Sequence, residues 1–571
     1  MLATQFYRPK NLTKLTLTLS TALLLAACGG GGGGSSSTPV VTPPSGGGGG
    51  TGGGSGSSGP TWTPGTFEPA SQFKNLCQTP RTAPDINGNP YPDQEGSTTE
   101  ENFWLRSWSD ETYLWYDEIT DRDPAAYTDR LEYFDLLRTT ATTPSGTPRD
   151  QFHFTIPTDE YEQRVVGGSS ASYGADFAFI RTTTPRDIRV AFTDPNTPAS
   201  ENDAFIRGSK ILEIDGVDAV NGGATQADID ILNNGLRPAT AGESHTFVVQ
   251  DPGSTESRTV TLISADLAIQ PVNKTEVIDT ASGKVGYIHF TTFGTRSAEE
   301  AIYNAMLTLE SENVTDLVLD LRYNGGGFLA IAGQIGYMIA GDARTDGRIF
   351  DNLVFNDKHP TINPVTGDTL SPTPFYDEIL GFAAGGPTPG TSLPSLDLNR
   401  VFILTTDDTC SASEAVMNGL RGVDVEVVQI GTRTCGKPYG FYATDNCGET
   451  YFTVQFRGEN DKGFGDYADG FQAANASSIV GESVPGCEIS DDFDNQLGSN
   501  SEALLAAALQ YREDGTCPAG STKIEPNISK AQFSDGLDLM SNRNFALDNF
   551  FKTSRIENLP AASLNHEEDS K

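Results

Sequence analysis

One stretch, residues 401–437, limits what this chain can fold into more than any other. A short apolar strand, 401–404, is followed by a polar turn and by Ser411, which opens a helix; a second apolar strand, 425–430, leads to Lys437. A serine at a strand-to-helix turn has its hydroxyl beside the free N–H groups of the helix. The lysine returns beside that serine with the next strand. The stretch therefore predicts Ser411 as a nucleophile and Lys437 as its base.

A triple glycine follows an earlier strand of the buried type. That strand covers residues 317–321, and residues 325–327 are all glycine. Glycines at a strand-to-helix turn leave backbone N–H groups free to face an anion, because no Cβ blocks the approach. Acyl transfer needs such donors at the oxyanion, and losing one costs about 10²–10³ in rate. We expect the N–H of Gly327 (or Gly326) and that of Ala412 to serve. A phosphate loop is excluded because no Gly-Lys-Ser/Thr follows.

A lysine is the candidate base because no histidine lies near the serine in the sequence. Burial disfavours the ammonium form and lowers the pKa of a lysine from about 10.4 towards neutrality. The alternative nucleophile is Ser413, but on a helix it would point about 200° away from Ser411. Glu414 is expected to support the helix N-terminus, where a carboxylate is favoured.

Two further regions precede the strand and helix alternation. Residues 75–160 have a helical pattern whose tryptophan stripe is interpreted as core, which predicts a small helical N-terminal domain. Residues 167–268 consist of short strands with turn signals and one helix at 225–234. The expected strands are 175–181, 188–192, 210–214, 246–250 and 259–263.

The strand and tight Asp-Gly turn at 208–216 resemble the signature of a PDZ domain. In such a domain, backbone N–H groups capture a peptide carboxylate and the next strand pairs with the peptide. The residues at the corresponding loop, which we expect to bind a peptide, are Tyr173, Gly174, Ala175 and Phe177.

The motifs together resemble the C-terminal processing (tail-specific) serine proteases. Residues 319–327, 411–414 and 436–437 follow that family's motifs in order, over roughly 167–516. The resemblance implies a crotonase/ClpP-like catalytic domain, a Ser/Lys dyad, no metal or cofactor, and cleavage near protein C-termini. It assigns Ser411 as nucleophile, Lys437 as general base, and Gly327 with Ala412 as oxyanion donors.

Two features of the chain depart from the pattern of the family. The separation between the serine and the lysine is one residue longer than expected. Many members also carry a glutamine four residues after the lysine, where this chain has Phe441. The group that orients Lys437 is therefore left open. The missing glutamine also keeps open a non-catalytic alternative, a peptide- or ligand-binding lipoprotein that retains the protease fold.

The N-terminus resembles a bacterial lipoprotein signal peptide. Basic residues precede an apolar run at 15–25, which ends in a small-residue motif at Cys28. The resemblance implies lipidation of Cys28 and a location in the cell envelope, on the outer membrane and facing the periplasm or exterior. Residues 29–74 form a linker rich in glycine, serine and proline.

The net charge of −38 argues against nucleic acid, whose phosphates require clustered Lys and Arg. Six cysteines remain after Cys28, and an even number in an exported chain favours disulfides. A Cys410–Cys435 bridge would join the two catalytic loops, with Cys447–Cys487 and Cys77–Cys517 as the remaining pairs. No metal site is expected, because no Cys-x-x-Cys occurs.

The sequence thus predicts a multi-domain α+β protein whose catalytic domain, 270–523, is of α/β type. A C-terminal tail, 524–571, has no assigned role. The predicted function is a serine endopeptidase that acts on exported proteins, with protein or peptide substrates bound through their C-termini.

Overall fold

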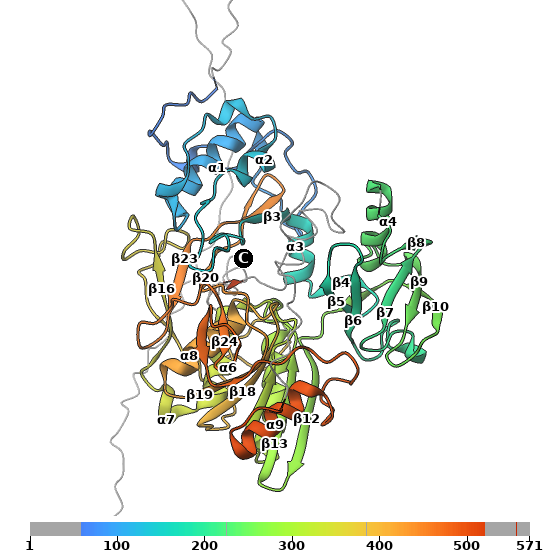
Figure 1. Ribbon diagram of the computed structural model, residues 1–571. Helices are drawn as coiled ribbons and strands as arrows, with labels where there is room; N and C mark the ends of the chain where they lie inside the picture. The colour runs from blue at the N-terminus through green and yellow to red at the C-terminus, as the bar shows by residue number, and fades with distance from the viewer. Residues whose placement is uncertain (1–58, 224, 384, 520–554, 557–571) are drawn as a thin grey trace, which may run out of the picture. The chain divides into compact units, whose positions relative to one another are not determined.

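The computed structural model describes residues 59–223, 225–383 and 385–519, together with the backbone strand Arg555–Ile556 (Figure 1). The expected signal peptide, its lipidation site Cys28 and most of the linker lie outside the described residues, as does the rest of the tail. Within the described ranges, no helix has the length and apolar character needed to cross a membrane.

A six-stranded sheet forms the centre of the catalytic part. Its first two strands are antiparallel and every other neighbouring pair is parallel. The strand order is β12 (Val272–Thr280), β13 (Gly283–Phe290), β14 (Asp316–Asp320), β18 (Arg400–Thr405), β19 (Glu426–Gly431) and β26 (Gly486–Cys487). The strands predicted at 401–404 and 425–430 are confirmed as β18 and β19.

Helices cover both faces of this sheet (Figure 1). The helices on one face are α5 (Ala298–Ser311), α6 (Leu329–Ala340) and α8 (Ala412–Gly422), and α9 (Ala503–Asp514) lies on the other. Because strand side chains alternate, Leu319 and Ile403 pack towards α6 and α8, whereas Val318 and Phe402 pack towards α9. The sequences of these strands are continuous hydrophobic runs because both faces of the sheet are buried.

The region 175–263 forms a separate antiparallel sheet with its own hydrophobic core. The predicted strands are confirmed, and the helix lies between β8 and β9. The elements are β5 (Ala175–Arg181), β6 (Asp187–Thr193), β7 (Lys210–Ile214), β8 (Val217–Asp218), α4 (Gln226–Leu236), β9 (Ser244–Gln250) and β10 (Ser257–Ile263).

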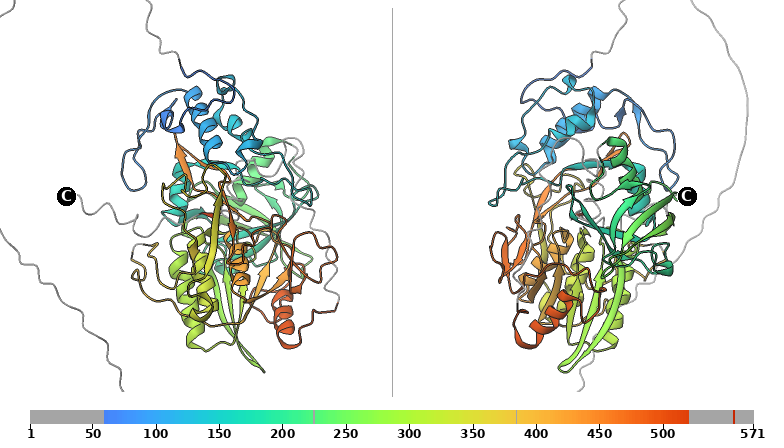
Figure 2. Two further views of the ribbon diagram at one scale, coloured as in Figure 1. Left: turned by 90° about the vertical axis from the view of Figure 1, so that its left-hand side faces the viewer. Right: turned by 45° about the vertical axis from the view of Figure 1, so that its right-hand side comes forward.

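The N-terminal helical region does not form a hydrophobic core from its own residues alone. Its tryptophans, Trp104 and Trp108, are core residues as predicted, but their cluster includes Tyr451 from a distant hairpin. That hairpin also pairs with a strand that follows the N-terminal helices. Both views in Figure 2 show the orange hairpin beside the blue helices. The elements are α1 (Thr98–Thr112), α2 (Arg130–Asp135), β3 (Phe154–Pro157), α3 (Thr158–Val165), β21 (Thr444–Asn446) and β22 (Glu449–Phe452).

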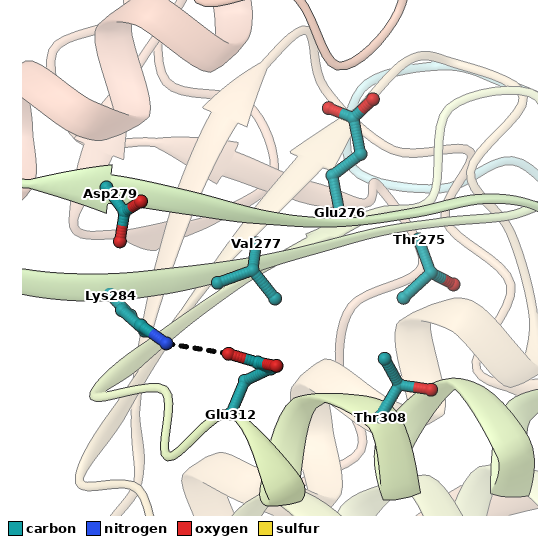
Figure 3. Close-up of a pocket in the computed structure, with 7 residues that line it drawn as sticks. All are labelled: Thr275, Glu276, Val277, Asp279, Lys284, Thr308 and Glu312. Carbon is teal, nitrogen blue, oxygen red and sulfur yellow. Dashed lines mark hydrogen bonds and ion pairs between the residues drawn. The ribbon is translucent and has the colours of Figure 1, made fainter.

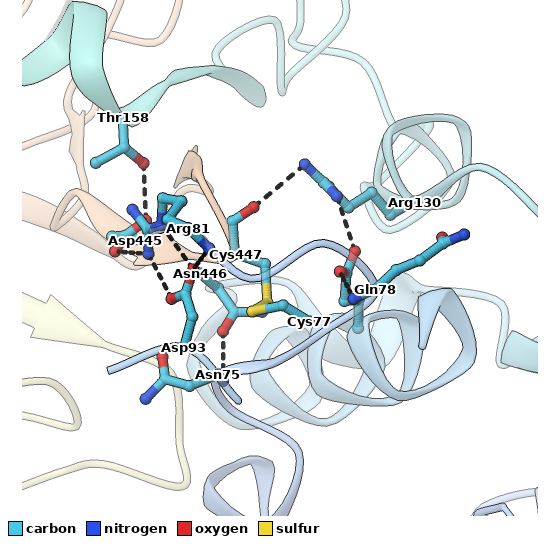
Figure 4. Close-up of a disulfide and its surroundings, with 11 residues drawn as sticks. Asn75, Cys77, Gln78, Arg81, Asp93, Arg130, Thr158, Asp445, Asn446 and Cys447 are labelled. Carbon is cyan, nitrogen blue, oxygen red and sulfur yellow. Dashed lines mark hydrogen bonds and ion pairs between the residues drawn. A yellow bond between two sulfur atoms is a disulfide. The ribbon is translucent and has the colours of Figure 1, made fainter. Parts of the chain in front are cut away.

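Two of the three predicted disulfides are wrong. Cys447 lies at the turn of the β21–β22 hairpin and bonds to Cys77, so it fastens the hairpin to the N-terminal region (Figure 4). Arg81 reinforces this junction with ion pairs to Asp93 and Asp445, each at 2.8 Å. The third disulfide joins Cys487, on the edge strand β26, to Cys517 after α9. Sheet topology, which sequence spacing does not reveal, brings these partners together.

The remaining elements are one short helix and the strands of smaller sheets, which have two to four strands each. They are β1 (Leu76–Cys77), β2 (Gln94–Glu95), β4 (Ser169–Ser172), β11 (Ala265–Ala268), β15 (Gly327–Phe328), α7 (Asp342–Thr345), β16 (Ile349–Phe355), β17 (Thr373–Pro374), β20 (Tyr439–Gly440), β23 (Phe456–Glu459), β24 (Phe471–Ala473), β25 (Glu482–Val484) and β27 (Arg555–Ile556).

Candidate active site

The predicted nucleophile, Ser411, lies at the N-terminus of α8, beyond the carboxyl end of β18. Its backbone has a φ of 59°, a left-handed conformation that costs about 1–3 kcal/mol in a residue with a side chain. The residue is fully buried, and its hydroxyl makes no hydrogen bond within the described part of the chain. A strained serine with an unbonded hydroxyl at the carboxyl edge of parallel strands is a candidate reactive group.

The predicted base, Lys437, is also fully buried. Its Nζ lies 4.2 Å from the ring centroid of Phe441 and 4.9 Å from that of Phe152. The amine is not hydrogen bonded to Ser411, because the Ser411 hydroxyl makes no bond to any described residue. The two side chains come from adjacent loops, and they are not in bonding contact in this structure.

Glu414 connects the two loops. Its carboxylate accepts hydrogen bonds from the backbone N–H groups of Ser411 at 3.0 Å and Lys437 at 2.8 Å. It also accepts from the N–H of Gly436 at 2.9 Å and the hydroxyl of Thr434 at 2.6 Å. Burial raises the pKa of Glu414, and these donors oppose that rise. The carboxylate thus does more than support the helix N-terminus, because it also fixes the lysine loop.

The predicted Cys410–Cys435 disulfide is confirmed. It joins the residue before Ser411 to the residue two before Lys437, with the two Cα atoms 5.2 Å apart. The loops of Ser411 and Lys437 are therefore linked twice, once covalently and once through Glu414.

The glycine loop packs directly against the serine. Gly326 and Gly327 have φ values of 102° and 138°, and a Cβ on Gly326 would lie 2.8 Å from the backbone nitrogen of Ala412. No side chain fits at that position without moving the backbone of Ala412 or Cys410 and the Cβ of Ser411. The N–H of Gly326 donates to the side-chain oxygen of Asn324 at 2.9 Å. Because that donor is engaged, Gly327 and Ala412 are the better candidates for the oxyanion donors.

The alternative nucleophile, Ser413, has a structural contact. Its hydroxyl is buried and donates to the backbone carbonyl of Asn324 at 3.1 Å, so it ties α8 to the glycine loop. This bond engages the Ser413 hydroxyl, whereas that of Ser411 is unengaged. The contrast favours Ser411.

A buried charge network supports the start of the glycine loop. Arg322 binds Asp320 at 2.6 Å, Asp491 at 2.7 Å and Glu502 at 2.9 Å. Burial alone would raise the pKa of Asp320, but Arg322 outweighs burial and lowers that pKa to about 2. Arg322 pairs with each of the three carboxyl groups, and such pairing is the condition under which charges are tolerated in an interior. The network therefore fixes the backbone that leads into the glycines.

The loop predicted to bind peptides begins the edge strand of the second sheet. Tyr173 and Phe177 are buried in its core, and Gly174 has a φ of 76°. Within the described residues, β5 pairs only with β6, so its other edge is open for an added strand. Binding at this loop would therefore involve the backbone of Gly174 and Ala175 rather than the two aromatic side chains.

One residue that contacts the site was not predicted. Phe152 lies in the N-terminal region, 285 residues before the lysine that it covers, and it has an exposed fraction of only 6%. A lone phenylalanine before an apolar strand carries no sequence signal that would assign it to an active site. Its role follows only from the packing of the N-terminal region against the catalytic part.

Two groups of possible metal ligands occur within the described residues, Cys77–Glu101–Cys447 and Cys410–Glu414–Cys435. In each group both sulfurs form a disulfide, so neither is a thiolate that could bind a metal.

A pocket on the edge of the central sheet is separate from this site (Figure 3). Its lining residues are Thr275, Glu276, Val277, Asp279, Lys284, Thr308 and Glu312, and none is a candidate catalytic residue. The exposed Lys284–Glu312 ion pair spans it at 2.6 Å.

Two comparisons with known proteins bear on this chain, one with family models and one with solved structures. Residues 284–441, which include the glycine loop, Ser411 and Lys437, match the model of peptidase family S41. A search of curated proteins finds no match. The structure resembles a protein assigned as an S41 protease from Bacteroides fragilis NCTC 9343, with 21% identity, a TM-score of 0.53, and coverage of 75% of this chain and 98% of that one. This similarity confirms the predicted fold class.

Two further solved structures are similar. One is the photosystem II D1 C-terminal processing protease, with 19% identity, a TM-score of 0.40, and coverage of 67% of this chain and 93% of that one. The other is the PDZ domain of a carboxy-terminal protease from Vibrio cholerae, solved with a peptide. It has 19% identity and a TM-score of 0.14, and it covers 18% of this chain and 99% of that one.

Proposed function

We propose that this chain, a serine peptidase whose residues 284–441 belong to family S41, cleaves peptide bonds with Ser411 as nucleophile and Lys437 as general base. The observation that carries the proposal is the double link between the two loops: Glu414 and the Cys410–Cys435 disulfide hold a strained, unbonded serine beside the lysine loop.

The chemistry is acyl transfer. The neutral amine of Lys437 takes the hydroxyl proton of Ser411 while the oxygen attacks the peptide carbonyl carbon. The carbonyl oxygen becomes an oxyanion and accepts hydrogen bonds from the N–H groups of Gly327 and Ala412. The ammonium then protonates the leaving amine, and water hydrolyses the acyl-enzyme. Because Ser411 and Lys437 are not bonded in this structure, the mechanism requires their side chains to meet when substrate binds.

An extended peptide is the substrate class that the site favours. The backbone of Arg555–Ile556 pairs in parallel with Gly327–Phe328, so the edge beside the glycine loop accepts an extended segment. The open edge of β5 offers a second place for strand addition. We propose that β5 and the loop at Gly174 hold a substrate C-terminus, and that the substrates are exported proteins.

The envelope location belongs to the same proposal. Lipidation of Cys28 would anchor the enzyme to the membrane, and the glycine- and serine-rich segment that follows Cys28 would let the folded part reach away from the membrane surface. Replacing Cys28 by Ser should abolish incorporation of labelled palmitate and release the protein from the membrane fraction. If the variant stays labelled and membrane-bound, the anchor assignment is wrong.

The proposed dyad is tested with purified full-length protein and a disordered protein substrate. Ser411→Ala and Lys437→Ala should each lower kcat/KM by about 10³-fold or more. The matched control, Ser413→Ala, removes one hydrogen bond worth ~1 kcal/mol and should retain activity within about fivefold. Wild-type rates in either dyad variant would refute the assignment. An inactive wild type would instead favour the peptide-binding alternative.

Preference for a C-terminus is tested with one substrate in two forms. A peptide with a free terminal carboxylate should be cleaved with a lower KM than the same peptide with an amidated terminus, because backbone N–H groups bind the carboxylate. Equal KM values would contradict capture of the C-terminus.

A further inference from the structure

Two aromatic rings enclose the amine of Lys437, and the mechanism above gives them no role. The Nζ lies 4.2 Å from the ring centroid of Phe441 and 4.9 Å from that of Phe152. Both distances are within the ~6 Å over which a cation is attracted to an aromatic face. Phe441 is fully buried and Phe152 nearly so, and such attraction is larger where water is excluded.

We propose that Phe441 and Phe152 are positioning residues that form an aromatic clamp on Lys437. The clamp holds the lysine side chain and stabilises the ammonium that forms when the amine takes the proton of Ser411. The inference rests on the proposed Ser411/Lys437 dyad. It assigns to aromatic faces the orienting role that the sequence left open at position 441.

Packing fixes Phe441 in place. Its ring lies 5.2 Å from that of Phe452 and 6.0 Å from that of Phe154, both at steep interplanar angles. Edge-to-face contacts of this kind favour one orientation of the ring plane. The face that Phe441 presents to Lys437 is therefore preorganised.

The second ring is fixed through the N-terminal region. The N–H of Phe152 donates to Asp150 at 2.9 Å, and Asp150 accepts the hydroxyl of Tyr113 at 2.6 Å. On the other side, the ring of His153 is hydrogen bonded to Thr453 at 3.1 Å. Phe152 is thus held between two anchored neighbours, which explains how a remote segment provides one wall of the site.

The clamp has a defined effect on the reaction. An aromatic face attracts the ammonium much more than the neutral amine, because the attraction is electrostatic. Where the resting lysine is neutral, on the alkaline plateau of the pH profile, the rings lower the barrier, because the ammonium forms in the transition state. Where the resting lysine is already an ammonium, the rings stabilise both states and the effect cancels. Rings that attract the ammonium less should therefore lower the rate on the alkaline plateau and move the acid limb of the pH profile to lower pH.

Other charged or titratable groups on the surrounding elements are Glu414 on α8, Asp150 and His153 before β3, and Tyr439 on β20. All four remain unchanged in the variants below, so a shift of the pH profile reports the ring at position 441.

The test replaces Phe441 in the full chain with phenylalanines that carry one, two or three ring fluorines. Fluorine withdraws electron density from the ring face with little change in size. On the alkaline plateau, kcat should fall stepwise, to about one tenth of wild type for the trifluoro ring, while KM stays near its original value. The unfolding temperature of each variant verifies that the fold is retained.

The matched control carries the same series at Phe456. This ring is equally buried and packs against Phe355 and Tyr442. A stepwise fall at 441 without a trend at 456 supports the clamp. A flat series at 441, with Ser411→Ala and Lys437→Ala still inactive, refutes the clamp and leaves the dyad intact. An active Ser411→Ala enzyme refutes the dyad and the clamp with it.

Discussion

The carboxylate of Glu414 accepts a hydrogen bond from the backbone N–H of Lys437 at 2.8 Å. The residue three positions after the proposed nucleophile therefore holds the loop of the proposed base. Since the same carboxylate also binds the N–H of Ser411, one buried group sets the relative position of both proposed catalytic loops.

Replacing Glu414 by Gln should damage both stability and catalysis. The amide keeps one acceptor oxygen but turns an NH₂ group towards backbone donors, leaving buried groups unpaired at a cost of about 2–3 kcal/mol. Displacement of the lysine loop by about 1 Å is enough to lower kcat about 100-fold. Urea unfolding and steady-state kinetics measure the two effects.

The chain provides a matched control in Glu299. This buried carboxylate also accepts three backbone N–H groups, those of Leu380, Gly381 and Phe382, and it binds Gln334. Glu299→Gln should lose a similar free energy of unfolding, about 2–3 kcal/mol, with kcat within about twofold of wild type. Equal losses of kcat in both variants would mean that Glu414 acts only on stability.

The Cys410–Cys435 disulfide should affect catalysis as well as stability. Replacing both cysteines by Ser removes a bridge across 25 residues, worth about 3.5 kcal/mol in the chain-entropy model. Because the bridge holds the two catalytic loops together, we also expect kcat to fall about tenfold or more. The same loss should follow treatment of the wild type with a dithiol reductant that opens this bridge.

The Cys487–Cys517 bridge is the control, because its separation of 30 residues gives nearly the same entropic contribution, about 3.5 kcal/mol. Its double Ser variant should lose similar stability but keep kcat in the folded protein. If both variants lose kcat equally, the first disulfide has no special role at the site.

Much of the catalytic part could be predicted from the sequence, because local patterns determine it. Apolar runs such as 401–404 predict where the strands lie. The glycine run at 325–327 marks the end of a strand, because the backbone conformations of Gly326 and Gly327 are ones that only glycine adopts readily. The predicted loops meet because parallel strands place their carboxyl ends at one edge. The Cys410–Cys435 pairing was predictable for the same reason.

Long-range packing was not predictable. The sequence spacing of Cys77 and Cys447, 370 residues apart, contains nothing that pairs them, since their contact depends on how β22 adds to β3. The same packing brings Phe152 to Lys437. Glu414 was recognised as a helix N-terminal carboxylate, but its bonds to the lysine loop depend on the return path of the chain after β19.

Acid should destabilise the fold through buried His153. Its pKa is lowered from 6.5 to about 4, because burial disfavours the charged ring. Between these values the unfolded chain binds a proton that the folded chain does not, so stability falls as the pH falls through that window. From pH 7.5 to 4.5 this one group should remove about 2.5 kcal/mol.

The measurement compares urea unfolding of wild type and His153→Gln at both pH values. The variant is less stable at pH 7.5, because hydrogen bonds to Thr453 and Phe134 are perturbed, but its stability should fall less on acidification. Other titrating groups, including Asp194 with its pKa raised by burial to about 6, cancel in the difference. Identical acid dependence in both proteins would contradict a neutral buried His153.

Arg207 should couple the second sheet to the glycine loop. Its buried guanidinium donates to the hydroxyl of Tyr323 at 2.9 Å and pairs with Asp491 at 2.7 Å. Tyr323 directly precedes Asn324, which binds the N–H of Gly326. Burial alone would raise the pKa of Asp491, but Arg207 and Arg322 together lower it. Removing one partner of such a buried pair costs about 3–5 kcal/mol.

Arg207→Met should therefore lower stability by about 3–5 kcal/mol and lower kcat about tenfold, since Tyr323 loses a contact that holds the loop. Arg258→Met is the control: this partly exposed arginine on β10 pairs with Asp251 at 2.6 Å, at a site where ion pairs contribute about 0–1 kcal/mol. Measuring kcat per folded molecule separates an effect on catalysis from the loss of stability. A kcat unchanged in Arg207→Met would restrict this arginine to stability and leave the glycine loop independent of the second sheet.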